Sequence, residues 1–362
     1  VVYVTGTAVQ VTIANVTLTG GRDSSSECAA SSCGGGLKVD AGADVTLTHS
    51  TVRDNTAYYG GGIFSYGTLQ IVHSTIANNV AESWDGGIYS SGSLTIENST
   101  ISGNTATSGN AGGLASVGTL TMRNSTIFGN TAAGDTGGFR QQSNAASIYN
   151  TIIANNSGAD CSLADGGSLA ANVHNLVEDG TCSPYLTGNP QLGSLADNGG
   201  DTLTHTLLPN SPAIDAGEAA SCLTTDQRGL ARDDLGCDLG AFELRYADSD
   251  TVIRPVTAAL STFGPTLAGI RNDGGAGADD PGVVTVIKSF TWATKPDNTI
   301  DAYWHITPGS GASYNLTLQL CYLPGELNGL SEGDLRFWRY SGGSWTQVGA
   351  APLAWETING NR

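Results

Sequence analysis

The chain has 362 residues, of which 50 are glycine, and its formal net charge is −18. This balance disfavours nucleic acid and anionic membrane surfaces as partners, because phosphate binding needs clusters of Lys and Arg. No apolar run is long enough to cross a membrane, so we expect no membrane insertion.

The N-terminal stretch already has the character of a strand. Val1 to Val4 is β-branched and aromatic, and neither an initial Met nor a signal peptide precedes it. We therefore expect the sequence to begin inside a longer precursor. The insert Asp23 to Gly34 carries two cysteines and is expected to form a surface loop.

A repeat of about 25 residues dominates the first half of the chain. Gly-Gly pairs begin at Gly35, Gly61, Gly86, Gly112 and Gly137, in steps of 26, 25, 26 and 25 residues. Within each repeat the apolar residues alternate with polar ones, which is the periodicity of strands. The alternating positions align in columns, of which one is Val52, Ile76, Ile101, Ile127 and Ile152.

A parallel β-helix accounts for these columns. Each repeat forms one turn of about three short strands, and successive turns stack roughly 4.8 Å apart, so that equivalent residues lie above one another. A further column of asparagines is predicted to form a structural ladder of side-chain hydrogen bonds at a corner. Its members are Asn55, Asn79, Asn104, Asn130 and Asn155.

From Cys161 the repeat becomes irregular, and a charged segment follows. We interpret it as a cap that closes the end of the helix, since a terminal turn must shield an open core. Its charged residues are Asp215, Asp226, Arg228, Asp238 and Glu243. A catalytic reading would use Arg228 as a cation beside carboxylate ligands or bases, whereas the structural reading, which we favour, buries Arg228 against those acids.

The cysteines lie in local pairs whose spacing matches no metal-binding motif. We expect three disulfides, formed in an oxidising compartment, and a free thiol at Cys321. The expected pairs are Cys28 with Cys33, Cys161 with Cys182, and Cys222 with Cys237.

Three short motifs in the irregular segment support a family resemblance. They are Ile-Asp-Ala-Gly at 214–217, Asp-Gln-Arg-Gly at 226–229 and Cys-Asp-Leu-Gly-Ala-Phe-Glu at 237–243. Together with the Ser-Thr-Ile and Asn-Thr-Ala turns, they resemble bacterial secreted right-handed parallel β-helix proteins of the polymorphic-outer-membrane-repeat and choice-of-anchor type. The resemblance covers about residues 1–245 and implies a right-handed helix and a secreted or cell-surface location.

The C-terminal region has a different pattern. Residues 246–254 are polar and acidic and are expected to form a linker. Residues 255–362 contain alternating segments separated by turns, without the 25-residue period. This predicts a small antiparallel β-sandwich, either incomplete or completed by another chain.

Chemistry is hard to find in the sequence. A polysaccharide lyase or a glycoside hydrolase would need clustered carboxylates, and the stacked columns bring none together, so we predict no catalytic or metal residues. The stacked His49 and His73 lack a third ligand. The acidic, Gly-rich run 272–280 could bind Ca²⁺, but its spacing fits no known loop, so we expect no cofactor. Trp345, in a Gly-Gly-Ser turn, is the candidate glycan contact.

Three hypotheses about function follow. The first is a non-catalytic extracellular structural or surface protein that assembles with itself, end to end, into a fibre or sheath. The second is a carbohydrate-active β-helix enzyme, and the third is a glycan-binding adhesin. Product release from polysaccharides would favour the second, whereas binding lost on Trp345→Ala would favour the third.

Overall fold

The computed structural model divides into two units, Val1–Leu244 and Arg245–Arg362. In the first unit it describes residues 1–23, 34–208, 211–232 and 237–244. In the second unit it describes the backbone of eight strands. Cys28, Cys33 and Cys321 lie outside the described residues, so the predictions made for them are not addressed.

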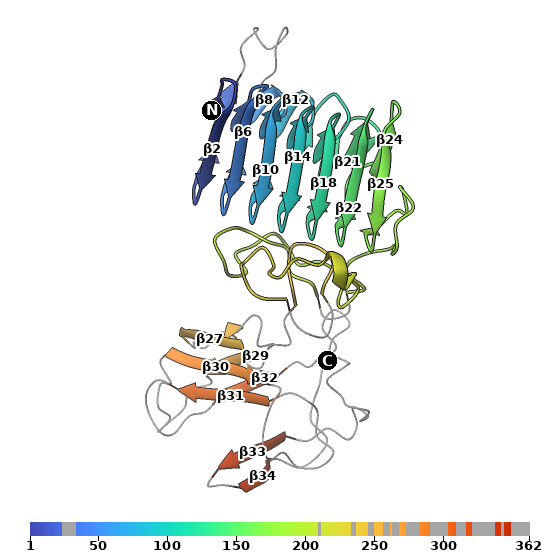
Figure 1. Ribbon diagram of the computed structural model, residues 1–362. Coiled ribbons are helices and arrows are strands. Elements are labelled where there is room, and N and C mark those ends of the chain that lie inside the picture. Colours follow the sequence, from blue (N-terminus) through green and yellow to red (C-terminus); the bar gives the residue numbers. More distant parts are fainter. Residues whose placement is uncertain are drawn as a thin grey trace. The chain divides into compact units, whose positions relative to one another are not determined.

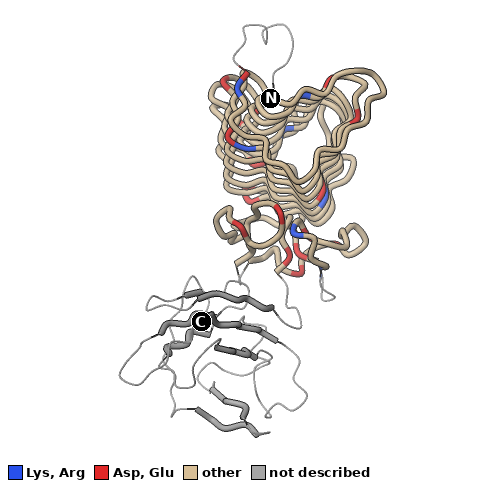
Figure 2. The backbone as a smooth tube through the Cα atoms, turned by 90° about the vertical axis from the view of Figure 1, so that its left-hand side faces the viewer, with Lys and Arg blue, Asp and Glu red and all other residues tan. Residues whose placement is uncertain are grey.

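The first unit is a parallel β-helix with four sheets, which we name A to D in the order in which each coil visits them (Figure 1). All strand pairs within these sheets are parallel. From the second coil to the sixth, paired residues in neighbouring coils are 24 to 26 positions apart, as in Leu47 with Ile71, Leu69 with Leu94 and Leu94 with Leu120. Viewed along the helix axis, successive coils superpose on one another (Figure 2).

The strands of the four sheets have the following bounds. Sheet A contains β1 (Val2–Val4), β5 (Leu37–Val39), β9 (Ile63–Ser65), β13 (Ile88–Ser90), β17 (Leu114–Ser116), β21 (Thr136–Gln142) and β24 (Ala159–Ala164). Sheet B contains β2 (Val9–Ala14), β6 (Ala43–Thr48), β10 (Thr68–Val72), β14 (Ser93–Glu97), β18 (Thr119–Arg123), β22 (Ala145–Tyr149) and β25 (Ser168–Val173). Sheet C contains β3 (Thr17–Thr19), β7 (Thr51–Arg53), β11 (Thr75–Ala77), β15 (Thr100–Ser102), β19 (Thr126–Phe128), β23 (Ile152–Ala154) and β26 (Leu176–Val177). Sheet D contains β4 (Arg22–Asp23), β8 (Thr56–Tyr59), β12 (Val80–Trp84), β16 (Thr105–Ala106) and β20 (Thr131–Ala132).

The apolar columns fill the interior of the helix, as the alternation predicts. Leu47, Ile71, Ile96 and Met122 are paired across sheet B and are fully buried. Inward-pointing side chains from sheets A, B and C meet in one continuous core. The repeat therefore determines the fold through burial of one face of each short strand.

The predicted columns are wrong by one residue in the sixth coil. Ile127 pairs with Ile153, where the predicted column continued at Ile152, and in the same coil Leu120 pairs with Ala146 and Met122 with Ile148. The turn after β21 holds one additional residue, since Leu114 pairs with Phe139 at the start of that coil. The extra residue restores Ile148, rather than a serine, to the core.

The segment predicted to cap the helix lies elsewhere. The described residues of the range 187–244, which we call the cover segment, run back along the outer face of sheet C (Figure 1, yellow). Thr75 Oγ1 donates to Leu203 O at 2.6 Å, and Thr126 Oγ1 accepts from Ala241 N at 3.0 Å. Since these threonines belong to different coils of sheet C, the segment covers the side of the helix, and the prediction of an end cap is wrong.

A second hydrophobic core joins the cover segment to sheet C. The outer face of the last coils is apolar there, because Ile152, Ala154 and Leu176 are buried on it. They pack against Leu207, Ala213, Leu239 and Phe242 of the cover segment. Toward the first coils this apolar contact gives way to threonine hydrogen bonds.

Two of the predicted disulfides are confirmed. Cys161 of β24 is bonded to Cys182, and Cys222 is bonded to Cys237 within the cover segment. The second bond lies just after the 3-10 helix Ala219–Ser221. Both bonds fasten segments that lack the regular repeat, where strand pairing alone supplies few constraints.

The second unit contains antiparallel strand pairs. One sheet is formed by β27 (Asp250–Pro255), β30 (Val283–Ser289) and β31 (Tyr303–Pro308), and another by β28 (Ser261–Thr262), β29 (Ala268–Asn272) and β32 (Leu316–Leu320). A hairpin joins β33 (Phe337–Ser341) to β34 (Ser344–Val348). The β-sandwich stays a prediction, because most other residues of this unit lie outside the described part. Among the described residues, no helix has the length and apolar character needed to span a membrane.

Candidate functional site

The asparagine ladder occupies the corner between sheets C and D and is fully buried over most of its length. Each Nδ2 donates to the Oδ1 of the next member at 2.9 Å and also to a backbone carbonyl of the preceding coil. The members are Asn55, Asn79, Asn104, Asn130 and Asn156. Amides aligned in this way polarise one another, so the ladder is a structural element.

Asn155 was predicted as the last member of this ladder, and that prediction is wrong. The extra residue in the sixth coil shifts the register, so that Asn156 occupies the ladder position. Asn155 is exposed at φ +55°, and its backbone N–H donates to Glu178 Oε2. Asp160 Oδ1 accepts from Asn156 Nδ2 at 2.8 Å and ends the series.

Five charged side chains of the cover segment form a buried network, namely Asp226, Arg228, Arg232, Asp238 and Glu243, whereas Asp215 is exposed (Figure 2, below the helix). Arg228 Nε donates to Asp226 Oδ2 at 2.7 Å, and the guanidinium lies 3.7 Å from the centroid of the Phe242 ring. Asp226 also accepts from the backbone N–H groups of Arg228 and Leu230. This geometry corresponds to the structural reading of Arg228, in which the pair holds the cover segment together.

A second arginine completes this network, although no sequence pattern pointed to it. Arg232 Nη1 donates to Glu243 Oε2 at 2.6 Å, and its Nη2 donates to Asn98 Oδ1 at the corner between sheets B and C. Asp238 Oδ1 accepts from Asp215 N at 2.8 Å. Burial first, and then the neighbouring Glu243, raises the pKa of the Asp238 carboxyl well above its usual range. These side chains are committed to one another, which argues for packing rather than catalysis.

The exposed aromatic side chains of the first unit gather on one side of the helix. Among the described residues, five aromatic side chains are strongly exposed, and four of them belong to sheets A and D or the turns beside these sheets. Those four are Tyr3, Tyr58, Tyr66 and Trp84, each between 40 and 52 % exposed. We call the side that carries them the aromatic face.

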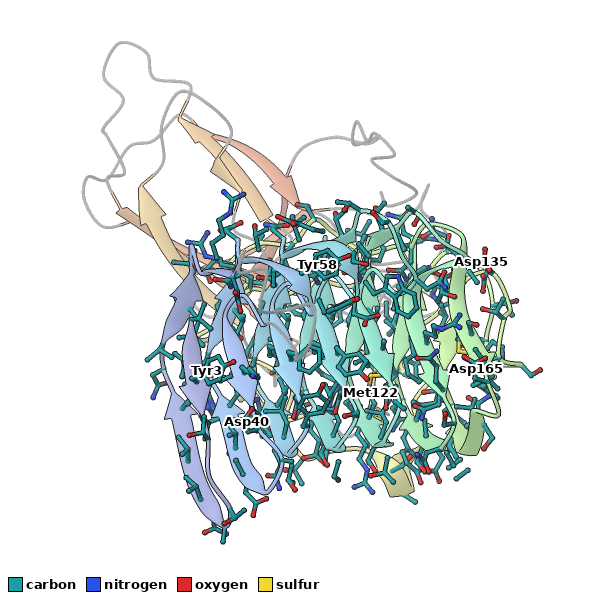
Figure 3. The ribbon with its side chains drawn as sticks, turned by 90° about the horizontal axis from the view of Figure 1, so that it is seen from above. Tyr3, Asp40, Tyr58, Met122, Asp135 and Asp165 are labelled. Carbon is teal, nitrogen blue, oxygen red and sulfur yellow. A yellow bond between two sulfur atoms is a disulfide. The ribbon has the colours of Figure 1, made fainter. Side chains whose placement is uncertain are left out.

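The aromatic face is an ordered surface. Phe64 and Tyr89, paired across sheet A, are stacked at 4.5 Å, and Tyr66 meets Phe64 edge-on at 5.0 Å. In the neighbouring sheet D, Trp84 pairs with Tyr59. Figure 3 shows Tyr3 and Tyr58 toward the N-terminal end of this side and the carboxylates of Asp135 and Asp165 toward the other end. Stacked strands thus place rings from separate coils side by side.

The Trp84 ring is seated by a glycine. A Cβ added at Gly109 in the next coil would fall 1.8 Å from Trp84 Cδ1, so the indole lies directly against that backbone. Only a residue without a side chain leaves room for the ring in this position. The sequence did not reveal this, because Gly109 belongs to a Ser-Gly-Asn run that is typical of any turn.

A buried carboxyl adjoins the aromatic face. Asp85 follows β12 directly and is 4 % exposed. Burial raises the pKa of the Asp85 carboxyl well above its usual range, and the Arg140 guanidinium opposes this shift only in part. Burial, followed by the charge of Asp85, also raises the pKa of the Tyr89 hydroxyl.

We predict that Asp85→Asn stabilises the protein at neutral pH. Because the pKa is raised on folding, the native state holds the Asp85 proton to higher pH than the unfolded state does. The contribution to stability is therefore greatest below the ordinary pKa and is lost as pH rises through the native pKa. Urea unfolding at several pH values should show that the free energy of unfolding declines less steeply with rising pH in the variant than in the wild type. The same decline in both proteins would contradict the assignment of the raised pKa to Asp85.

The stacked histidines predicted from the sequence lie at the corner between sheets B and C. His49 and His73 stack at 4.8 Å, and His73 Nδ1 lies 3.1 Å from Gln227 O of the cover segment. A cavity of about 210 Å³ opens beside His49 and is lined by Thr51 and Asp201, among others. Among the residues that the structure describes, no three His, Cys, Asp or Glu side chains are grouped to hold a metal ion. Residues 273–280 of the acidic run lie outside that part, and the side chain of Trp345 in β34 is not described.

Comparison with a protein-family model agrees with the parallel β-helix. The family model for a right handed beta helix region matches residues 2–136 and residues 35–193. A solved structure described as pectate lyase Pel9A is 17 % identical, with a TM-score of 0.36, and the match covers 64 % of this chain and 65 % of that chain. The chain thus spans less than two thirds of the lyase, and likeness at this level says nothing about activity. A search of curated proteins found no match. By the family match, this chain belongs to the right handed beta helix region family.

Proposed function

We propose that this chain is a non-catalytic extracellular surface protein whose aromatic face binds a neutral polysaccharide. The observation that supports this best is the grouping of Tyr3, Tyr58, Tyr66 and Trp84 on one side of the first coils. An aromatic ring that stays exposed on a soluble surface is a typical contact for an apolar ligand face. The C–H faces of sugar rings are apolar, whereas their edges carry hydroxyl groups.

Two further properties of the molecule support this assignment. The net charge of −18 disfavours an anionic polysaccharide, so a neutral one fits better. The rings project from paired strands, which hold them at fixed spacing and thereby reduce the entropy lost on binding. The disulfides fit an oxidising, extracellular setting.

The test is a binding experiment with a panel of neutral polysaccharides, followed by calorimetry on any that bind. We expect Trp84→Ala and Tyr66→Ala each to weaken binding about tenfold, since each removes roughly 1.5 kcal/mol of apolar contact. Tyr185→Ala is the matched control, because Tyr185 is exposed but stacks on His174, away from the aromatic face. Equal losses in all three variants, or binding by none of the panel, would refute the proposal.

The same experiment separates this function from the enzymatic alternative. A bound polysaccharide should keep its chain length after prolonged incubation with the protein, whereas a lyase or hydrolase would shorten it. Self-assembly into a fibre or sheath stays a prediction from the sequence.

A further inference from the structure

Asp85 occupies a position that directs its side chain onto the aromatic face. In the preceding coil the equivalent residue is Gly60, because Gly61 N bonds to Asp85 O and Tyr59 pairs with Trp84. A Cβ added at Gly60 would lie 3.2 Å from the Cβ of Phe64. Tyr89 is the register partner of Phe64, so the side chain of Asp85 begins beside Tyr89 on the outer face of sheet A.

Asp85 is only 4 % exposed. Among the described residues, none donates a hydrogen bond to its carboxylate. Burying a carboxylate without donors is costly, which is the cause of its raised pKa. Four described side-chain atoms are fully buried and lack a hydrogen-bond partner, namely Ser90 Oγ, Arg123 Nε, Thr136 Oγ1 and Gln141 Oε1. The Asp85 oxygens do not belong to this group, so they are not fully buried. The carboxylate therefore meets solvent at its outer edge.

The groups around Asp85 fit a sugar. Trp84 precedes it in sequence, and Tyr89, on which the charge of Asp85 acts, belongs to the contacting series Tyr89, Phe64 and Tyr66. The charged and titratable groups that act on the carboxyl are Tyr89 on β13 and Arg140 on β21. Arg140 itself is 3.5 Å from Asp165, which leaves Asp85 without a close cation.

We propose that Asp85 is the specificity-determining acceptor of the aromatic face and takes hydrogen bonds from two hydroxyl groups of a neutral sugar. This inference rests on the proposed function. An unpartnered carboxylate beside exposed rings offers a sugar both an apolar platform and a strong, charge-assisted acceptor. The hydroxyl groups of the ligand donate the hydrogen bonds that no described protein group donates to Asp85. A ligand without these hydroxyl groups leaves the buried acceptor unsatisfied.

Binding should be coupled to proton release. Hydroxyl donors stabilise the ionised carboxyl, so the sugar lowers the raised pKa of Asp85 and expels a proton. By the same linkage, affinity should fall as pH decreases through the pKa of the free protein. Calorimetry in two buffers of different ionisation enthalpy measures the number of protons released.

The test compares Asp85→Asn with Asp135→Asn in the full chain, using the polysaccharide that the wild-type protein binds. Both substitutions remove one carboxylate from the same side of the helix, but Asp135 is exposed. We expect Asp85→Asn to weaken binding about tenfold and to abolish proton release, while Asp135→Asn changes neither. Unfolding measured in parallel should show that Asp85→Asn has lost no stability.

The outcomes separate this inference from the proposed function. If Asp85→Asn binds the polysaccharide as tightly as the wild type while Trp84→Ala binds it more weakly, the role of Asp85 is refuted. The proposed binding by the aromatic face is then retained. Undiminished proton release in Asp85→Asn would also overturn the role of Asp85. If the wild-type protein binds no polysaccharide, both proposals fail.

Discussion

Asn104→Ala should destabilise the β-helix by about 3–5 kcal/mol, which is a large share of the stability of most domains. Asn104 is fully buried, and its Nδ2 donates to Ile76 O and Asn130 Oδ1. Its Oδ1 accepts from both nitrogens of Asn79. The alanine variant leaves several buried groups unpartnered at once and interrupts the ladder at its centre. Urea unfolding followed by far-UV circular dichroism measures the change.

The matched control for this ladder variant is Asn155→Gly. Asn155 is exposed and has φ +55°, which glycine adopts without strain. We therefore expect a change within about 0.5 kcal/mol, as for most surface substitutions. A large loss at Asn155, or a small one at Asn104, would show that the ladder does not run through Asn156 and does not support the fold.

Arg232→Ala should release the cover segment from sheet C, at a cost of about 3–5 kcal/mol, typical of breaking one half of a buried ion pair. The guanidinium is 3 % exposed and contacts Glu243, Asn98 and the carbonyl oxygen of Gly240. In the alanine variant, the buried Glu243 loses its arginine partner and stays close to the Asp238 carboxyl. Hydrogen exchange should rise first in the cover segment and at Thr75 and Thr100, whose side chains bond to that segment.

Arg53→Ala provides the contrast for Arg232. Arg53 forms an ion pair with Asp54 at 2.6 Å, but both side chains are nearly half exposed. Exposed pairs contribute less than about 1 kcal/mol, and salt screens them. If Arg53→Ala and Arg232→Ala cost the same, or if exchange in the cover segment is unchanged in Arg232→Ala, the anchoring role of Arg232 is wrong.

The sequence alone determined the repeating part of this protein. Stacked coils bring residues about one repeat apart, mostly 24 to 26 positions, into contact, so one short repeated pattern reveals both the core and the buried ladder. Leu69, Leu94 and Leu120 align for this reason, as do Asn55, Asn79 and Asn104. The pattern failed only where a single extra residue entered the turn after β21, because a one-residue insertion shifts every later position.

Only the tertiary structure decided where the non-repeating features lie. Thr75 meets Leu203 across 128 residues, and His73 meets Gln227 across 154, and contacts at such separations leave no local period in a sequence. The irregular sequence of the cover segment therefore predicts an end cap, and only its contacts with sheet C show that it covers the side of the helix. Asp85 is likewise an ordinary acidic residue before a Gly-Gly pair. Its burial without a donor beside stacked rings arises from three neighbouring coils, because only their stacking removes water from one side of that carboxyl.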